Sequence, residues 1–125
     1  MSTWITVCDT CKREDWESSV AGELTDGERL AEQVEALVAA GGTVRVRRHS
    51  CLMGCKRSCN VAIQAAGKIA YTLGEFEPKS DAARAIVDYA QMHAASETGQ
   101  VPYREWPEAI KGHFVTRHLP LPDET

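Results

Sequence analysis

The chain has 125 residues and a formal net charge of −4 at pH 7, with 43% hydrophobic and 26% charged residues. This length suits one globular domain with its own core, and the mild negative charge gives no general argument for nucleic-acid binding. No apolar run approaches the ~20 residues of a membrane-spanning helix, and the start lacks the features of a signal peptide, so we expect a cytoplasmic protein that binds no membrane.

The first third of the chain predicts a strand, a polar loop and a helix. Residues 4–7 are β-prone, and residues 8–24 are polar without clear periodicity. Thr25 and Glu28 then have the spacing of a capping box, which predicts the start of a helix. The apolar stripe of this helix is formed by Leu30, Val34, Leu37 and Val38. The pair Gly41-Gly42 predicts its end.

Three strands and a second helix are predicted next. Residues 43–49 alternate valine and arginine, which is typical of a half-buried strand. Residues 61–65 and 68–72 predict two strands, and the glycine-containing dipeptide between them suits a tight hairpin. A helix is predicted over residues 81–96, with an inner face formed by Ala83, Ile86, Val87, Ala90 and Ala94.

The predicted order is therefore β-α-β-β-β-α, an α/β fold. The βαβ crossover gives a parallel strand pair, and the hairpin adds antiparallel strands, so we expect a mixed sheet flanked by two helices over residues 1–98. Residues 99–125 contain four of the five prolines. We expect them to form an extended tail, with one short turn near Trp106-Pro107, packed on the same domain.

All five cysteines gather in two short segments. Cys8 and Cys11 form C-x2-C after the first strand, and Cys51, Cys55 and Cys59 form C-x3-C-x3-C after the third predicted element. Cytoplasmic thiols stay reduced, and an odd number of cysteines also argues against a disulfide framework. Thiolates are soft ligands that select zinc, copper(I) or iron–sulfur clusters. Four thiolates on two loops can enclose one such centre.

These features resemble the thioredoxin-like [2Fe–2S] ferredoxins over roughly residues 4–96. The resemblance lies in the order of elements, a cysteine just after the first strand and C-x3-C after the second strand. It implies a thioredoxin-like fold with a [2Fe–2S] cluster at one end. It also implies an electron carrier, without catalytic residues of its own.

The resemblance also implies a set of ligands. Cys8 and Cys11 match the two ligands of the first loop, and Cys51 and Cys55 match the C-x3-C pair, which leaves Cys59 close by as a spare. Two features differ from the ferredoxin pattern. The first two cysteines are closer in sequence than is usual, and Cys59 stands in a place where Gly-Pro is usual.

The string from Cys51 to Ile63, Cys-Leu-Met-Gly-Cys-Lys-Arg-Ser-Cys-Asn-Val-Ala-Ile, resembles a second family. That family consists of small predicted metal-binding proteins without assigned chemistry, often associated with cobalamin biosynthesis genes. This resemblance extends into the tail.

Three functions stay open at the level of the sequence. The first is electron transfer by an iron–sulfur cluster. The second is a zinc-binding structural or metal-handling role, because two cysteine pairs also satisfy tetrahedral zinc. The third is thiol redox chemistry at Cys8 and Cys11. His49, two residues before Cys51, is a further candidate ligand for zinc or Rieske-type iron, although its position also suits the end of a strand.

Basic residues surround the central cysteine segment in the sequence: Arg45, Arg47, Arg48, Lys56 and Arg57. They predict a solvated strand face, cations that stabilise a reduced cluster and raise its potential, or a docking surface for a redox partner protein with an acidic surface. An oxidoreductase of cobalamin synthesis is the partner that the second resemblance implies. We expect no nucleic-acid partner, and the sequence leaves open whether the chain forms a homodimer.

Overall fold

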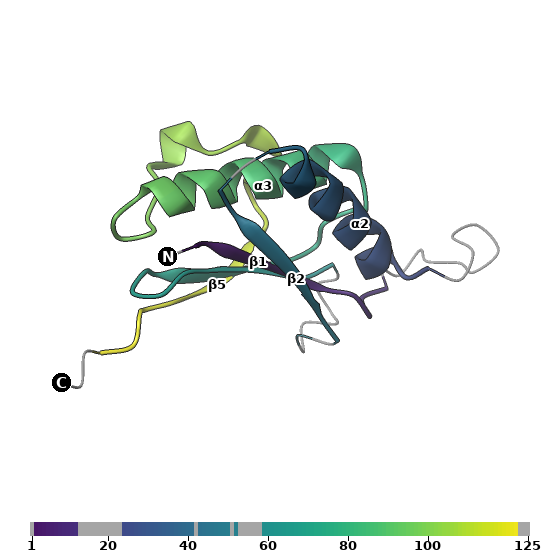
Figure 1. Cartoon of the computed structure of the whole chain (residues 1–125), viewed down its shortest axis with the longest axis horizontal. Coiled ribbons are helices and arrows are strands. Elements are labelled where there is room, and N and C mark those ends of the chain that lie inside the picture. Colours follow the sequence, from purple (N-terminus) through teal and green to yellow (C-terminus); the bar gives the residue numbers. More distant parts are fainter. Residues whose placement is uncertain (1, 13–23, 42, 51, 53–58, 123–125) are drawn as a thin grey trace.

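A five-stranded mixed sheet forms one layer of the structure, and two helices form the other (Figure 1). The computed structural model describes residues 2–12, 24–41, 43–50, 52 and 59–122, and this account is confined to them. Along the chain the elements are β1 (Trp4–Cys8), α2 (Asp26–Ala39), β2 (Arg45–His49), β3 (Val61–Gln64), β4 (Ala70–Leu73), α3 (Ser80–Ala95), the 3-10 helices η2 (Tyr103–Glu105) and η3 (Glu108–Ile110), and β5 (Phe114–His118).

The strand order across the sheet is β2-β1-β3-β4-β5. Strands β1 and β2 are parallel, whereas β3 is antiparallel to both β1 and β4, and β5 is antiparallel to β4. The predicted β-α-β-β-β-α order, the mixed sheet and the two helices are therefore confirmed. No helix in the described ranges combines the length and the apolar character that crossing a membrane requires.

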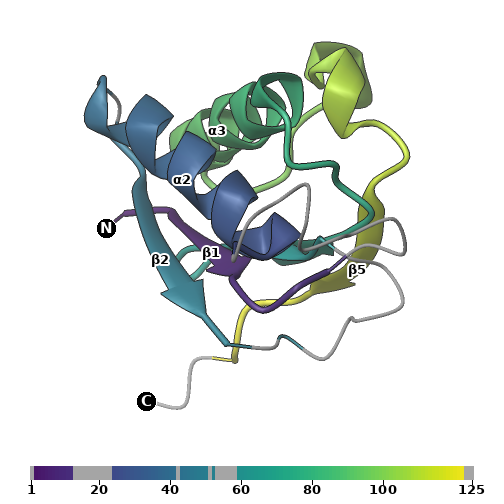
Figure 2. The ribbon, with the colours of Figure 1, turned by 90° about the vertical axis from the view of Figure 1, so that its right-hand side faces the viewer.

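Both helices lie side by side on the same face of the sheet (Figure 2). The strands turn alternate side chains toward the helices, because successive residues of a strand point to opposite faces. The fully buried strand residues on that face are Ile5, Val7, Val61, Ile63 and Leu73. Leu30 and Val34 of the predicted apolar stripe of α2 meet them from above, and both are buried.

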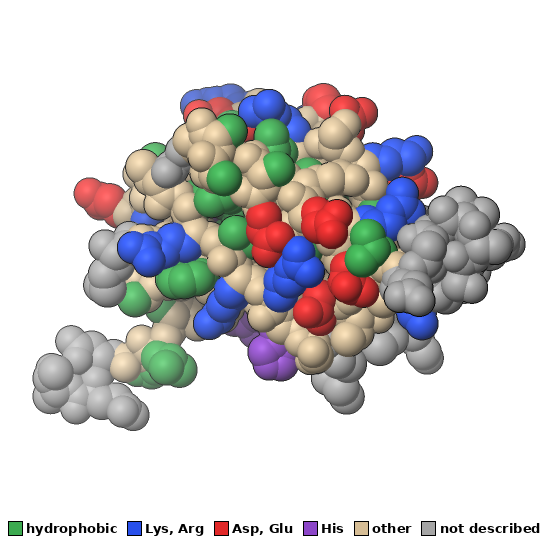
Figure 3. All heavy atoms as spheres, turned by 45° about the vertical axis from the view of Figure 1, so that its right-hand side comes forward, with side chains coloured by type: hydrophobic (Ala, Val, Ile, Leu, Met, Phe, Trp, Pro, Cys, Tyr) green, Lys and Arg blue, Asp and Glu red, His purple; other side chains and the backbone are tan. Residues whose placement is uncertain are grey.

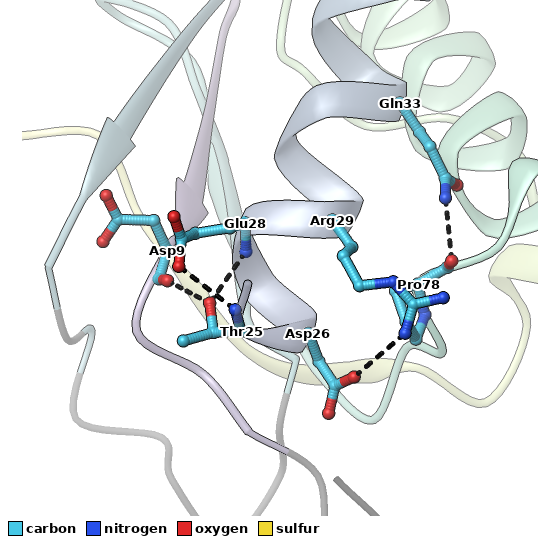
Figure 4. Close-up of polar contacts among 7 residues, drawn as sticks. All are labelled: Asp9, Thr25, Asp26, Glu28, Arg29, Gln33 and Pro78. Carbon is cyan, nitrogen blue, oxygen red and sulfur yellow. Dashed lines mark hydrogen bonds and ion pairs between the residues drawn. The ribbon is translucent and has the colours of Figure 1, made fainter. Parts of the chain in front are cut away.

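The predicted capping box at the start of α2 is present (Figure 4). The Glu28 amide donates to the Thr25 hydroxyl at 3.0 Å, and the Thr25 amide donates to the Glu28 carboxylate at 3.1 Å. One turn further, the Gln33 side chain donates to the Pro78 carbonyl at 2.8 Å, which ties α2 to the segment that precedes α3.

The tail adds a strand that the sequence analysis did not predict. Residues 114–118 pair with β4 as β5 and extend the sheet. Three of these five residues are polar or charged, so their sequence has no clear alternation, and the open edge of β4 determines their conformation. The predicted turn at Trp106-Pro107 lies between two short 3-10 helices. Ile110 of the second one is buried in the core.

A buried histidine of α3 joins the helix to the residues that directly precede β1 and β4. The His93 ring donates from Nε2 to the Ile69 carbonyl at 2.7 Å, so Nδ1 is left to accept from the Thr3 hydroxyl at 3.0 Å. Gly99 passes the ring with φ of +87°, and a Cβ there would lie 2.7 Å from Nε2, so only glycine fits. Burial lowers the pKa of His93, although its hydrogen bond to Ile69 acts in the opposite direction.

The lowered pKa of His93 predicts that the protein loses stability in mild acid. The pKa of His93 is lower in the folded protein than its ordinary value of about 6.5 in the unfolded chain. Its contribution is therefore fully present above pH ~6.5 and falls below it, because the unfolded chain then takes up a proton that the folded protein excludes. We expect urea unfolding between pH 8 and pH 5 to show a smaller acid loss for His93→Gln than for the wild type.

The difference between the wild type and His93→Gln in the free energy of unfolding grows by at most about 1.4 kcal/mol per pH unit below pH ~6.5. His118→Gln, at an exposed histidine of β5, is the matched control and keeps the acid loss of the wild type. An equal acid loss in wild type and His93→Gln would contradict the prediction.

Candidate metal centre

Two of the five cysteines lie together where β1 runs into the loop before α2. Cys8 is the last residue of β1 and Cys11 follows in the loop. Both are buried, at 2% and 3% exposure, and neither takes part in a disulfide. We call Cys8 and Cys11 the cysteine pair. The Cys8 amide donates to the Asn60 carbonyl at 3.1 Å, and the Asp9 amide donates to the His49 carbonyl at 3.2 Å, so neighbours on both sides hold the loop's first residues.

The start of α2 holds the other side of this loop. The Gly27 amide donates to the Cys11 carbonyl at 2.9 Å, and the Thr25 hydroxyl donates to the Asp9 carbonyl (Figure 4). A Cβ at position 27 would lie 1.9 Å from the Cys8 carbonyl oxygen. Glycine therefore lets the helix start approach the loop closely. The positive end of the helix dipole faces the cysteine pair as a result.

The two thiols of the cysteine pair share a hydrogen bond, and their acidities differ. Burial, together with the bond to Cys8, raises the pKa of Cys11 to about 11. Burial alone would also raise the pKa of Cys8, but hydrogen bonds from Cys11, the Leu52 backbone and Thr10 outweigh it and leave that pKa below its ordinary value. Cys8 is therefore the group that ionises first.

N–H groups are directed at both sulfurs. The Asn60 side-chain amide donates to the Cys11 sulfur at 3.6 Å, and the Asn60 backbone amide donates to the same sulfur. The Cys8 sulfur accepts from the backbone amides of Leu52 and Thr10. Leu52 follows Cys51 in the sequence, so the contact joins a described residue of the second cysteine segment to the first. Such donors stabilise a thiolate, which is the form that binds metal.

The remaining predicted site residues do not complete a metal site in the described structure. Cys51 and Cys55 lie outside the described residues, as do Lys56 and Arg57. Cys59 is buried just before β3, and its amide donates to the Phe76 carbonyl at 3.2 Å. Across the described ranges, no three or more Cys, His, Asp or Glu side chains are grouped so that they could hold a metal ion.

The strand register places the basic residues of β2 at different distances from the cysteine pair. Arg45 lies opposite Trp4 and His49 lies opposite Cys8. Arg45 is therefore at the other end of this strand pair from Cys8. The Arg45 and Arg47 guanidinium groups lie 5.8 and 5.7 Å from the centre of the Trp4 ring.

Arg48 lies nearer the cysteine pair, and its side chain is paired with Glu35. Its guanidinium makes two hydrogen bonds to the Glu35 carboxylate, at 2.7 and 2.9 Å. His49 is exposed and ends β2, as its strand interpretation predicted. The sequence analysis missed Asn60 and the Leu52 amide as sulfur partners. Only Asn60 carries a sequence signal, as a polar residue directly before a buried strand.

Comparisons with known proteins give one family and one solved structure of similar fold. The model of a family described as a protein of unknown function (DUF1636) matches residues 5–120. Among solved structures, a thioredoxin-like [2Fe-2S] ferredoxin from Aquifex aeolicus is similar, with 13% sequence identity and a TM-score of 0.51, over 95% of this chain and 94% of that chain. No curated protein matches. The fold is therefore thioredoxin-like, as the sequence predicted.

The contact at Gly27 predicts that replacing this glycine by alanine destabilises the protein, which is the opposite of the usual effect in a helix. Glycine to alanine inside a helix normally stabilises by about 1 kcal/mol. Here the added Cβ meets the Cys8 carbonyl at 1.9 Å, so we expect Gly27→Ala to destabilise by about 1–3 kcal/mol through overpacking. Urea unfolding of the metal-free protein measures the change. Ala36→Gly, at an exposed position of α2, gives the propensity effect alone. A Gly27→Ala protein more stable than the wild type would refute the contact.

Proposed function

We propose that this chain, which belongs to the DUF1636 family, is an iron–sulfur protein that holds a [2Fe–2S] cluster and transfers single electrons. The observation that carries the proposal is the set of N–H groups directed at the buried sulfurs of the cysteine pair. Hydrogen bonds to cluster sulfurs are one of the means by which proteins set cluster potentials. The thioredoxin-like fold supports the proposal, because the structural neighbour from Aquifex aeolicus is a [2Fe-2S] ferredoxin with that fold.

The donor chemistry of the described residues fits such a cluster. The buried thiols of Cys8 and Cys11 are soft ligands held on a loop whose backbone is hydrogen-bonded on both sides. In the proposal, Cys51 and Cys55 supply the other two ligands and Cys59 is the spare. The cluster, when bound, accepts and returns one electron.

Polar groups of the chain around the cysteine pair stabilise negative charge on its sulfurs. The Asn60, Leu52 and Thr10 N–H groups offset negative charge on the two sulfurs. The N-terminal end of α2 adds a partial positive charge beside the same loop. Both effects become larger when an electron is added, because the site is then more negative. They therefore favour the reduced state and raise the reduction potential.

A dithiol–disulfide function is the second candidate, and the acidities of the cysteine pair favour it. In C-x2-C sites a thiolate of lowered pKa is the attacking group, and the pKa of Cys8 is lowered while that of Cys11 is raised to about 11. The low exposure of both thiols favours the cluster over this candidate, because an attacking thiolate needs access to the partner's sulfur. Cys8 and Cys11 are only 2% and 3% exposed. Ligands of a buried cluster need no such access.

We predict that anaerobically reconstituted protein contains about two iron and two sulfide per chain and shows the visible absorption of a [2Fe–2S] protein. Cys11→Ser is expected to disturb this spectrum strongly, because it removes a ligand, whereas Cys59→Ser leaves it nearly unchanged. Stoichiometric zinc without iron after reconstitution would support the zinc-binding alternative and overturn the proposal. A larger effect of Cys59→Ser than of Cys11→Ser would show that Cys59 is a ligand and Cys11 is the spare.

The Asn60 contact predicts a change in potential. Asn60→Ala removes the side-chain N–H that reaches the Cys11 sulfur at 3.6 Å, so the reduction potential is expected to become more negative. A spectroscopic redox titration of the reconstituted protein measures it. Gln64→Ala, at the exposed end of β3, the strand that follows Asn60, is the control and keeps the wild-type potential. Equal potentials for Asn60→Ala and the wild type would show that Asn60 does not influence the reduction potential.

The partner and the pathway stay predictions. The sequence predicts a redox partner with an acidic surface. The resemblance to the second family implies that this partner is an oxidoreductase of cobalamin synthesis. Arg48 is bound to Glu35, and Arg45 lies at the far end of β2. The proposed docking surface therefore depends on Lys56 and Arg57.

A further inference from the structure

The exposed large hydrophobic side chains in the described part of the chain all lie in its C-terminal quarter. They are Tyr103 at 63%, Val115 at 37%, Leu119 at 81% and Leu121 at 93% exposure. Single exposed apolar residues are normal on a protein surface, but a group of them in one region marks an interaction site. These four fall into two parts, a groove and an arm.

The first part is an aromatic groove beside β5. It has a volume of about 490 Å³, and its apolar lining consists of Tyr71, Val101, Tyr103, Trp106, Phe114 and Val115. The Trp106 ring centre lies 4.5 Å from that of Phe114 and 4.9 Å from that of Tyr103. The Trp106 indole N–H donates to the Val101 carbonyl at 2.8 Å. The groove is therefore a preformed aromatic surface.

The second part is the C-terminal arm, residues 119–122, with the sequence Leu-Pro-Leu-Pro. It runs away from the sheet after β5 (Figure 1), and hydrophobic side chains stand on this protruding end beside residues drawn in grey (Figure 3). Prolines lack an N–H group and favour the extended polyproline II conformation. Aromatic-lined grooves are the surfaces that bind such segments.

The arm of one chain does not line the groove of the same chain. The groove is lined by Phe114, Val115, Thr116 and Arg117 of β5, and none of the arm residues 119–122 belongs to its lining. The arm borders a different hollow, with Trp4 and the turn between β3 and β4. Its leucines stay exposed there. Filling the groove therefore needs an arm that arrives from elsewhere.

The outer edge of β5 offers the way for that arm to arrive. In the described structure β5 pairs only with β4 and ends the sheet. An exposed edge strand presents unpaired N–H and C=O groups to another strand. If two β5 strands pair in antiparallel fashion about a two-fold axis at Thr116, Leu119 of one copy lies level with His113 of the other. That position adjoins Phe114 and Val115, which line the groove.

We propose that two copies of this chain form a dimer through their β5 strands and exchange C-terminal arms, each arm lying in the aromatic groove of the other copy. The contact is self-complementary, as a two-fold interface requires. It covers all four exposed side chains at once. The arm spans ~12 Å at ~3.1 Å per residue in the polyproline II conformation, which is the same scale as the ~17 Å of a five-residue strand at ~3.3 Å per residue.

Sedimentation equilibrium of the full chain tests the dimer. We expect the wild type to be dimeric at micromolar concentration. Leu119→Ser/Leu121→Ser in the arm and Tyr103→Ser in the groove are each expected to raise the dissociation constant at least about tenfold, which corresponds to about 1.4 kcal/mol. All three positions are exposed, so the fold tolerates the changes. Ala39→Ser/Ala40→Ser, at exposed positions at the C-terminal end of α2, is the matched control and stays dimeric.

Mixing the arm variant with the groove variant distinguishes exchange from a general apolar contact. Each homodimer of the variants has no intact arm–groove contact, but the mixed dimer has one, between the intact arm of the groove variant and the intact groove of the arm variant. We expect the mixture to dimerise more strongly than either variant alone. A monomeric wild type, a dimer that is indifferent to both variants, or a mixture no stronger than its components would each overturn the proposal. None of these readouts depends on an iron–sulfur cluster.

Discussion

The hydrogen bond from the Cys8 amide to the Asn60 carbonyl joins the two chain segments on which the rest of the site depends. It places the end of β1 beside the start of β3, although the two are separated by the whole of α2 and β2. The same asparagine then directs its amide groups at the Cys11 sulfur. The loop of the cysteine pair is thus shaped by one residue of a neighbouring strand and by the start of α2, which glycine allows to come close.

Two opposing effects meet at the sulfurs. Burial disfavours a thiolate, and it is the largest influence on the pKa of both Cys8 and Cys11. Hydrogen-bond donors favour a thiolate, and at Cys8 the Cys11 thiol, the Leu52 backbone and Thr10 together outweigh burial. A buried site that still supports a thiolate is suited to a bound metal or cluster, because the ligand must be ionised while water is kept out. The same balance explains why the pair also resembles a redox dithiol in its acidities and differs from one in its accessibility.

The sheet has a different character in its interior and at one edge. Strand β1, which lies between β2 and β3, carries the cysteine pair and is held by strand neighbours on both sides. The β5 end is an edge, and its exposed apolar side chains lie on the groove and on the arm. Electron transfer and self-association would therefore use separate surfaces of the same small domain. A dimer formed at β5 leaves the loop of the cysteine pair at the other side of the sheet in each copy.

The sequence by itself determined the order of the elements up to α3, the parallel pair of β1 and β2 and the hairpin of β3 and β4, because periodicity, capping and turns are local properties. Its resemblance to the thioredoxin-like ferredoxins implied the fold. The Thr25–Glu28 capping box needs only a spacing of three residues, and β1 to β4 are recognisable from their own composition. Tertiary structure alone decided three matters. Strand β5 forms because β4 offers an open edge, Arg45 lies at the other end of the strand pair from Cys8 because of the parallel register with β1, and Asn60 reaches the Cys11 sulfur across the β1–β3 junction. Each depends on residues far apart in the chain, whose approach no local pattern encodes.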